Sequence, residues 1–254
     1  MHIAITGASS GIGAALAREL AALPGVRLTL VARRKPLLEQ LAAELKVPAL
    51  VVPHDLGDPA HAADWIAAAE QANGPIDILV NNAGVQVVGP SATIDIEKAE
   101  EVLRVDLLSP LRLTRAVLPA MLARRSGVIV DVSSMAALAP TPGMTWYNAA
   151  KAGLAAASES LRGELRGTGV HVVTVYPGII GETDMARAAL TKYEISKAVS
   201  AQPVGTAAGL ARLVRVAIEK RQARVIYPRV NTLARWFPAP TRWLLDHFTP
   251  AVKA

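Results

Sequence analysis

The stretch "TGASSGIG", residues 6–13, decides the fold that we expect for this chain. It follows an apolar run, "HIAIT" (2–6), and opens a segment that we expect to be helical over 12–22. In a strand–loop–helix unit, glycines permit a sharp turn, close approach of the backbone to a pyrophosphate, and packing of the helix on the strand. The N–H groups at the helix start favour an anion. This setting predicts a dinucleotide-binding loop rather than an ordinary turn, formed by Gly7, Ser9, Ser10, Gly11, Ile12 and Gly13.

The rest of the chain alternates short apolar runs with longer amphipathic segments. The runs that we expect to form strands cover 2–6, 27–32, 48–53, 76–81, 127–133, 170–176 and 223–228. The segments that we expect to be helical lie near 12–22, 35–45, 58–73, 96–125, 145–167 and 204–221. Strands covered by helices on both faces are nearly continuous in apolar residues. The alternation therefore predicts an α/β fold, a Rossmann-type doubly wound parallel sheet of about seven strands, in one domain over residues 1–228.

Composition narrows the classes of function. Of the 254 residues, 52% are hydrophobic and 19% are charged, which suits a large core and not a disordered chain. The net charge is +6, but the basic residues are scattered, so we expect no nucleic-acid partner. The chain has no cysteine for disulfide or thiolate chemistry, and its five histidines lack metal-ligand spacing. Because we see no signal region and no apolar run long enough for a membrane span, we expect a cytoplasmic protein.

The end of the second strand indicates which dinucleotide binds. An acidic residue there would bind the ribose 2′-hydroxyl of NAD, whereas a basic residue accommodates the 2′-phosphate of NADP. The strand ends in "LVARRK" (30–35), which has no carboxylate and two arginines. We therefore expect NADP(H) to be preferred over NAD(H), with Arg33 as the first choice for the phosphate contact and Arg34 as the second. The alternative is a solvated basic turn.

The stretch "TWYNAAKAG" (145–153) carries the candidate chemistry. Tyr147 and Lys151 lie four residues apart, so they share one face of a helix. A nearby ammonium favours the phenolate and lowers the pKa of a tyrosine, whose reference value is about 10. The pair is either a general acid/base, with the pKa of the tyrosine lowered by the lysine, or an exposed helical pair without a catalytic role.

Together the motifs resemble those of the short-chain dehydrogenases/reductases, in the single-domain branch with TGxxxGxG spacing. They are "TGASSGIG", "NNAG" (81–84), a serine before "YNAAK" (147–151), and "PG" (177–178). The resemblance covers residues 1 to about 190. It implies an oxidoreductase in which Tyr147 is the catalytic acid/base, Lys151 lowers the pKa of Tyr147, and Ser134 holds the substrate oxygen. Ser133 is the adjacent alternative to Ser134.

The resemblance also implies the remaining contacts of a nicotinamide cofactor. Tyr147 and Lys151 contact its nicotinamide ribose end. The other positions carried over are Asp55 and Leu56 beside the adenine, Asn82, Ala83 and Gly84 beside the adenosine ribose, and Pro177, Gly178 and Ile180 beside the nicotinamide.

Two positions depart from the family pattern. Asp106, in "VDLLSP" (105–110), stands where the family has an asparagine that helps to hold a water relaying protons to the lysine. An ionised aspartate accepts hydrogen bonds but donates none, so we expect an altered proton relay. Glu182 stands where the family places a threonine, and Thr183 follows one position late. The contact of Thr183 with the nicotinamide end is therefore in question.

The expected substrate is a lipophilic ketone, aldehyde or alcohol. The segment between the serine and the tyrosine, "MAALAPTPGMTW" (135–146), is largely apolar, and so is much of 179–195, which the resemblance places over the active site as a lid. The alternative is that Met135, Met144 and Trp146 are ordinary buried packing. Two other functions compete: a non-catalytic NADP(H) sensor on the same fold, and an epimerase or dehydratase that retains its cofactor.

The tail, residues 229–254, differs from the rest of the chain. It contains both phenylalanines and two of the four tryptophans, interrupted by prolines that leave room for a short helix near 241–248. Such a tail can fold onto the core, cover a substrate, form a subunit contact, or touch a membrane surface weakly. The family resemblance suggests a homodimer or homotetramer formed through helices near 107–125 and 145–167.

Overall fold

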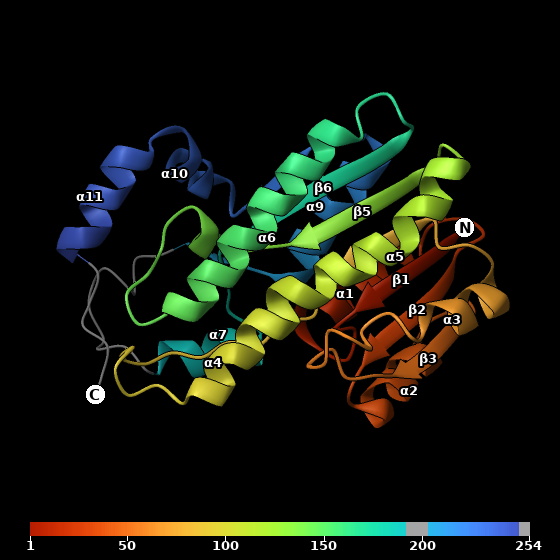
Figure 1. Ribbon diagram of the computed structural model, residues 1–254, viewed down its shortest axis with the longest axis horizontal. Helices are drawn as coiled ribbons and strands as arrows, with labels where there is room; N and C mark the ends of the chain where they lie inside the picture. The colour runs from red at the N-terminus through yellow and green to blue at the C-terminus, as the bar shows by residue number, and fades with distance from the viewer. Residues whose placement is uncertain (192–202, 249–254) are drawn as a thin grey trace.

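The seven apolar runs predicted as strands pair into one parallel sheet in the computed structural model, which describes residues 1–191 and 203–248 (Figure 1). The strands lie in the order β3-β2-β1-β4-β5-β6-β9. The chain therefore reverses its direction of winding between β1 and β4, the point where open α/β sheets bind ligands. The bounds are β1 His2–Thr6, β2 Arg27–Ala32, β3 Ala49–Pro53, β4 Ile78–Asn81, β5 Gly127–Val132, β6 Val170–Pro177 and β9 Arg224–Tyr227.

Helices cover both faces of the sheet because successive strand side chains point to opposite faces. Ile3 and Ile5 of β1 pack in a core with α1, α2 and α9, whereas Ala4 packs in a second core with α3 and α5. In Figure 1, α5 and α6 lie side by side across the face toward the viewer. The bounds are α1 Gly11–Leu20, α2 Lys35–Glu44, α3 Ile66–Asn73, α5 Ser109–Ala123, α6 Thr145–Glu164 and α9 Ala207–Glu219.

Two predicted helices differ from the observed ones. The single helix expected over 96–125 is wrong: α4 Ile96–Leu103 and α5 are joined by a π-helical turn, η1 Arg104–Leu108, which buries Asp106. The helix expected over 58–73 is shortened to α3. Its first part forms turns because Pro59 lies there and the Asp58 side chain accepts a hydrogen bond from the Ala60 N–H at 2.9 Å.

The remaining elements follow β5 and β6. They are the short 3₁₀ turn η2 Met135–Ala137, the two-stranded sheet of β7 Ile179–Ile180 and β8 Val204–Gly205, and helix α7 Asp184–Leu190. Residues 192–202 and 249–254 lie outside the described residues. They include the end of the expected lid (179–195) and the end of the expected tail (229–254).

The tail begins with the 3₁₀ turn η3 Arg229–Asn231, followed by α10 Thr232–Trp236 and α11 Pro238–Phe248. The predicted helix near 241–248 is therefore correct in type but begins earlier, because proline is tolerated in the first turn of a helix. Arg235 of α10 ties the tail to α6 by an ion pair with Glu159 at 3.1 Å. In Figure 1 the two tail helices lie beyond the end of the sheet toward which β5 points.

Candidate active site

The glycine loop joins β1 to α1 at the reversal point of the sheet. Gly7 has φ of 65°, and a Cβ there would lie 2.7 Å from Cα of Ala83. A Cβ on Gly13 would overlap the Gly7 carbonyl. Both positions thus require glycine, and the loop keeps its backbone open to the cleft as a phosphate-binding loop must.

The turn after β4 is fastened to this loop. The Asn82 side chain donates to the carbonyl of Thr6 at 2.9 Å, and the Thr6 hydroxyl accepts from the backbone N–H groups of Asn82 and Ala83 at 3.0 Å each. These bonds fix the two strand ends that flank the reversal point.

The two arginines after β2 both line the cleft but have different partners. Arg34 donates to the hydroxyls of Ser9 at 3.0 Å and Ser10 at 2.7 Å, so it lies against the glycine loop. Arg33 forms an exposed ion pair with Glu101 at 3.2 Å. The geometry brings Arg34 closer to the predicted phosphate site than the sequence order suggested.

Ser134, Tyr147 and Lys151 come together in the cleft from two segments. Tyr147 and Lys151 lie on one face of α6, with Nζ of Lys151 5.8 Å from the centre of the Tyr147 ring. The Ser134 oxygen accepts from the Ala136 N–H at 3.1 Å, and its hydroxyl is also hydrogen-bonded to the Tyr147 phenol, which acts to lower the pKa of Tyr147. The Ser133 hydroxyl instead donates to the Lys151 carbonyl at 2.7 Å, which favours Ser134 as the serine that faces a substrate.

Asp106 forms a buried ion pair with the lysine. Its Oδ1 accepts a hydrogen bond from the Val85 N–H at 2.7 Å. Its Oδ2 lies 3.1 Å from Nζ of Lys151, which makes an ion pair but without the geometry of a hydrogen bond. Lys151 also donates to the Val132 carbonyl at 3.1 Å. A Cβ on Gly84 would lie 2.9 Å from Oδ2, so the pair needs glycine beside it.

Burial and charge act against each other on the pKa values of these groups. Burial raises the pKa of Tyr147, and the Lys151 ammonium lowers it as expected, but by less. The carboxylate of Asp106 raises the pKa of Tyr147 further. Burial is the largest single effect on Lys151 and would lower its pKa, but Asp106, together with the smaller effects of Tyr147 and Asp131, outweighs burial and the net shift of the pKa is upward. Lys151 therefore stays charged beside a tyrosine that stays protonated.

Comparison with known proteins shows the family of the chain. Residues 1–194 match the family model described as short chain dehydrogenase. The chain belongs to the short-chain dehydrogenase family.

Individual relatives of this dehydrogenase support the assignment. It is 34% identical over 186 residues to a protein named ketoacyl reductase HetN from Nostoc sp.. The match covers 72% of this chain and 64% of that protein, so the chain spans slightly less than two thirds of the length of this relative. A short-chain dehydrogenase from Sphingobium yanoikuyae, solved in complex with NADPH, is 31% identical with a TM-score of 0.81 and covers 100% of this chain and 97% of its own. A metagenomic short-chain oxidoreductase in complex with NADP is 31% identical with a TM-score of 0.74, covering 89% and 96% of the respective chains.

The residues present fit the nicotinamide cofactor that the short-chain dehydrogenase family binds. The cleft has a volume of about 880 Å³ and runs from the glycine loop to Tyr147. The other predicted contacts line it too: Arg33, Arg34, Asp55, Leu56, Asn82, Ala83, Gly84, Pro177, Gly178 and Ile180. The glycine loop, with Arg34 beside it, suits a phosphate group at one end of the cleft.

The second departure from the family pattern changes which residue faces the cleft. Thr183 lies in the cleft, where its methyl carbon would be 3.2 Å from a Cβ on Gly11. Its hydroxyl accepts from the Ala186 N–H at 3.2 Å near the start of α7. Glu182 turns away and accepts from the Ala207 N–H at 3.2 Å. The late threonine thus faces the phosphate loop of this dehydrogenase.

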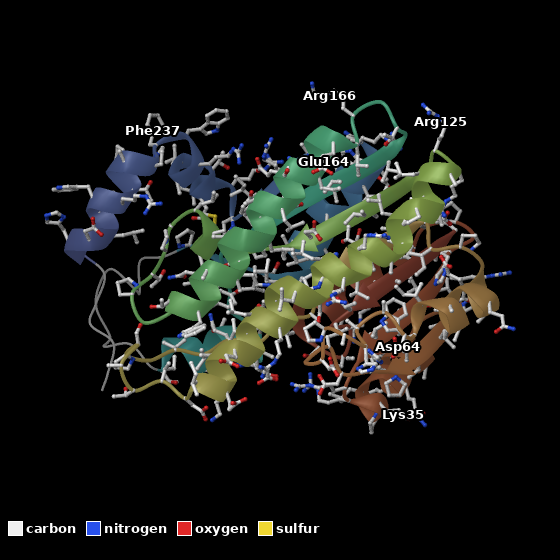
Figure 2. All side chains as sticks on the ribbon, viewed as in Figure 1. Lys35, Asp64, Arg125, Glu164, Arg166 and Phe237 are labelled. Atoms are coloured by element: carbon white, nitrogen blue, oxygen red, sulfur yellow. The ribbon has the colours of Figure 1, made fainter. Side chains whose placement is uncertain are left out.

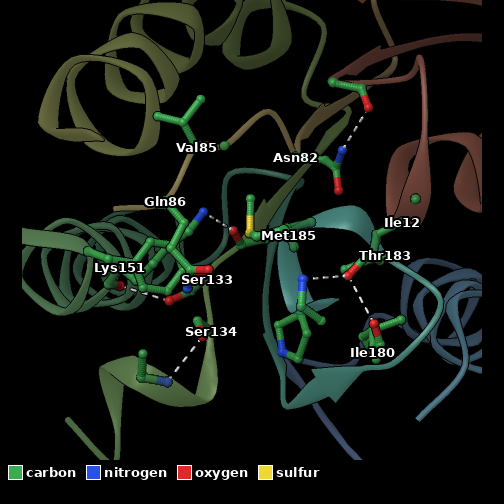
Figure 3. A pocket seen from close by; sticks show the side chains of 18 of the residues that line it. Ile12, Asn82, Val85, Gln86, Ser133, Ser134, Lys151, Ile180, Thr183 and Met185 are labelled. Carbon is green, nitrogen blue, oxygen red and sulfur yellow. Dashed lines mark hydrogen bonds between the residues drawn. The ribbon is translucent and has the colours of Figure 1, made fainter. Parts of the chain in front are cut away.

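Sequence reasoning missed several residues of the cleft. Val85, Gln86 and Met185 line it together with Ser134 (Figure 3), and the tail contributes Asn231, Ala234, Thr241, Leu244 and Leu245. Position 85 follows the "NNAG" motif and could have been inferred from it. No local pattern signalled the tail residues, because their position depends on how the tail folds back. Of the apolar candidates, Met135 and Met144 line the cleft.

Within the part of the chain that the structure describes, no helix is long and apolar enough to span a bilayer.

Proposed function

We propose that this short-chain dehydrogenase is an NADP(H)-dependent oxidoreductase that interconverts a lipophilic carbonyl compound and its secondary or primary alcohol. The observation that carries the proposal is the placement of Ser134, Tyr147 and Lys151 in one cleft with the glycine loop. When bound, the nicotinamide cofactor supplies or accepts the hydride.

Tyr147 acts as the general acid/base. During reduction, its hydroxyl donates a proton to the substrate oxygen, and during alcohol oxidation its phenolate accepts one. Ser134 donates a hydrogen bond to the same oxygen and stabilises the charge that develops there. Because a buried phenolate beside a charged ammonium costs less free energy than an isolated one, Lys151 favours the proton transfer.

Lys151 has a second role in binding the nicotinamide ribose. Its ammonium has three N–H groups, one of which is donated to the Val132 carbonyl, and its charge is paired with Asp106 at 3.1 Å. An N–H not used by Val132 suits a ribose hydroxyl. The Asp106 carboxylate stays ion-paired with Lys151 during the reaction. The proton relay to Lys151 therefore runs beside a carboxylate instead of the amide that the family resemblance implies.

Preference for NADP(H) is proposed from charge at the end of β2. Arg34, hydrogen-bonded to Ser9 and Ser10, and Arg33, ion-paired with Glu101, are two guanidinium groups at the end of β2, which supports a contact with a 2′-phosphate. Guanidinium groups bind phosphate through paired, charge-assisted hydrogen bonds. No carboxylate replaces them at the end of this strand to bind a 2′-hydroxyl.

A lipophilic substrate is proposed from the side chains around the catalytic end of the cleft. Those beyond Ser134 and Tyr147 are mostly apolar: Val85, Met135, Ala136, Ala139, Met144, Met185, Leu244 and Leu245. Such a lining binds alkyl or aryl groups by burial and offers no cation for an acidic substrate.

The proposed setting is a cytoplasmic homodimer or homotetramer, assembled through α5 and α6, whose tail makes weak contact with a membrane surface. Leu108, Leu111 and Leu122 are exposed along η1 and α5, which supports a subunit contact on that face.

The proposal is tested by following NADPH and NADH consumption with a panel of lipophilic ketones and aldehydes. Turnover that strongly prefers NADPH is expected. Tyr147→Phe should lower kcat at least about 1,000-fold while changing the Kd for NADPH less than about threefold, because the hydroxyl acts mainly in the transition state. Turnover that survives Tyr147→Phe would contradict the catalytic assignment.

A second candidate is the non-catalytic NADP(H) sensor, and the observation that favours it is the Asp106–Lys151 ion pair, which puts a buried carboxylate beside the lysine where the family resemblance implies an amide. The same variant separates the two functions. A sensor would bind NADPH tightly, show no turnover with any substrate, and keep its output after Tyr147→Phe.

A further inference from the structure

The tail carries a concentration of exposed apolar side chains. Val230, Leu233, Trp236, Phe237, Trp243 and Leu244 are each between 51% and 70% exposed, with Trp236 the most exposed. We call these six residues the tail patch. Figure 2 shows Phe237 at the outer side of the tail, away from the sheet. Large exposed patches of this kind mark surfaces that are covered by a partner.

The charge around the tail patch is basic. Arg229 and Arg242 are exposed, and no carboxylate among residues 1–191 and 203–248 forms an ion pair with either. Arg235 differs, because it forms an ion pair with Glu159. Asp246 is the only acidic residue in 229–248. The partner that best complements the tail patch is therefore apolar and negatively charged.

The tail patch is continuous with the mouth of the substrate cleft. Leu244 belongs to the patch and also lines the cleft, together with Ala234, Thr241 and Leu245 on the same two helices. Whatever covers the patch thus lies beside the opening through which an apolar substrate would enter.

The two tail helices suit contact with a membrane surface and are too short to cross a membrane. α10 has 5 residues and α11 has 11, whereas a helix needs about 20 to cross the hydrocarbon core of a bilayer. Short helices with tryptophan, phenylalanine and leucine beside arginine are typical of segments that lie in the interface, with aromatic rings at the headgroup level.

We propose that the tail patch docks on the surface of a bilayer that contains anionic phospholipid, and that this docking opens the substrate cleft toward the lipid. Trp236, Phe237 and Leu233 enter the interface, while Arg229 and Arg242 bind lipid phosphates. The second part rests on the proposed function, because it assumes that the cleft takes a lipophilic carbonyl compound or alcohol.

A second copy of the chain is a poorer occupant of the same surface. In a symmetric dimer the patch would face itself, so Arg229 and Arg242 would meet the same basic residues of the partner. Like charges placed across an interface oppose association.

Docking is tested with the full chain by sedimentation with vesicles of phosphatidylcholine, with and without one quarter phosphatidylglycerol. The wild type should bind the anionic vesicles at least about tenfold more tightly than the neutral ones, and added salt should weaken that binding. The double variant Trp236→Ser/Phe237→Ser should lose at least about tenfold in affinity. The double variant Arg229→Gln/Arg242→Gln should lose the preference for anionic vesicles.

Matched controls separate the tail patch from general surface properties. Ile96→Ser removes an apolar side chain that is 52% exposed on α4, and Arg27→Gln/Arg166→Gln removes two exposed arginines elsewhere. Both should bind vesicles like the wild type. The proposal is overturned if the wild type ignores anionic vesicles, or if the Trp236/Phe237 variant binds them equally well. A fall in molar mass of that variant without vesicle binding by the wild type would assign the patch to a second copy.

Activity measurements keep the two proposals distinguishable. With a small water-soluble ketone, the Trp236/Phe237 variant should turn over NADPH as fast as the wild type, since neither residue lines the cleft. With a long-chain ketone held in anionic vesicles, the variant should be at least about fivefold slower, while equal rates would overturn the entry route. Vesicle binding without turnover by the wild type would sink the proposed function and leave the docking intact.

Discussion

At the scale of single residues, Asp106 is one of the two positions that depart from the pattern implied by the family resemblance. Its carboxylate is fully buried and ion-paired with Lys151 at 3.1 Å. Burying an ion pair costs desolvation of both charges, and removing one partner leaves the other uncompensated. The pair is therefore tied to the charge state of Tyr147, whose pKa responds to both members.

Replacing Asp106 by asparagine should move the pH profile of the enzyme toward lower pH. The carboxylate raises the pKa of Tyr147, so its removal lowers that pKa. Alcohol oxidation needs the phenolate and rises with pH through the pKa, whereas reduction needs the protonated phenol and falls through it. Both transitions in kcat/KM should shift to lower pH in Asp106→Asn. The exposed Asp64→Asn should leave them in place, and an upward shift in Asp106→Asn would contradict the electrostatic account.

Arg34 and Arg33 give a second test at this scale. Losing a charge-assisted hydrogen bond to the 2′-phosphate should raise the KM for NADPH by about tenfold or more in Arg34→Ala, and should barely change the KM for NADH. Arg33→Ala, measured in parallel, decides the order of the two residues. Lys35→Ala is the control, because Lys35 already pairs with Glu39 at 3.6 Å. An unchanged ratio of the two cofactors in both arginine variants would remove the basis for NADP preference.

At the scale of elements, hydrophobic patterning predicted the strands of the main sheet to within two residues at each end. It did not predict the break between α4 and α5, because the apolar periodicity of 96–125 continues across it. The π-helical turn η1 buries Asp106 in the site, where it contacts Val85 and Lys151, both distant in sequence. Such turns are frequent at functional sites. Local propensity cannot detect them.

The contact between α6 and the tail should make the stability of the fold depend on pH. Glu159 accepts hydrogen bonds from Arg224, Tyr176 and Arg235, and the Arg224 contact is the main cause that lowers its pKa to about 2. A carboxyl with a depressed folded-state pKa contributes stability above its ordinary value, here 4.5, and loses that contribution as pH falls toward 2.

Glu159→Gln should therefore lower the urea midpoint at pH 7 and make it less dependent on pH between 5 and 3 than in the wild type. Glu164→Gln, an exposed position on the same helix, is the matched control and should follow the wild type. Parallel pH dependence in the wild type and Glu159→Gln would show that this contact contributes no pH-dependent stability.

At the scale of the whole molecule, the order of the sheet explains why residues far apart in sequence form one cleft. The glycine loop, the turn after β4, and Ser134 after β5 all lie at carboxyl ends of neighbouring parallel strands. Their motifs allowed these positions to be predicted. The tail residues of the cleft could not be predicted, because they reach it through α10 and α11, whose observed contact with the domain, Arg235 with Glu159, joins residues far apart in sequence and belongs to no motif.

The outer face of α5 gives the last prediction, which concerns assembly. Leu111 and Leu122 are 39% and 37% exposed there, and Leu108 just before the helix is 45% exposed. Neighbouring α6 presents small exposed residues, among them Ala149, Ala156 and Ser160, which would let a second copy approach closely (Figure 1). A subunit contact on this face would bury the leucines without covering the cleft or the tail patch.

Leu111→Arg should therefore reduce the molar mass measured by light scattering, from dimer or tetramer toward monomer, because a charge cannot be buried there without a partner. Ile96→Arg, on the exposed side of α4, should not change the mass. If instead Leu111→Arg keeps its assembly while Trp236→Ser/Phe237→Ser loses it, the subunit contact lies on the tail. The tail patch would then be covered by protein, and membrane docking would require the assembly to come apart.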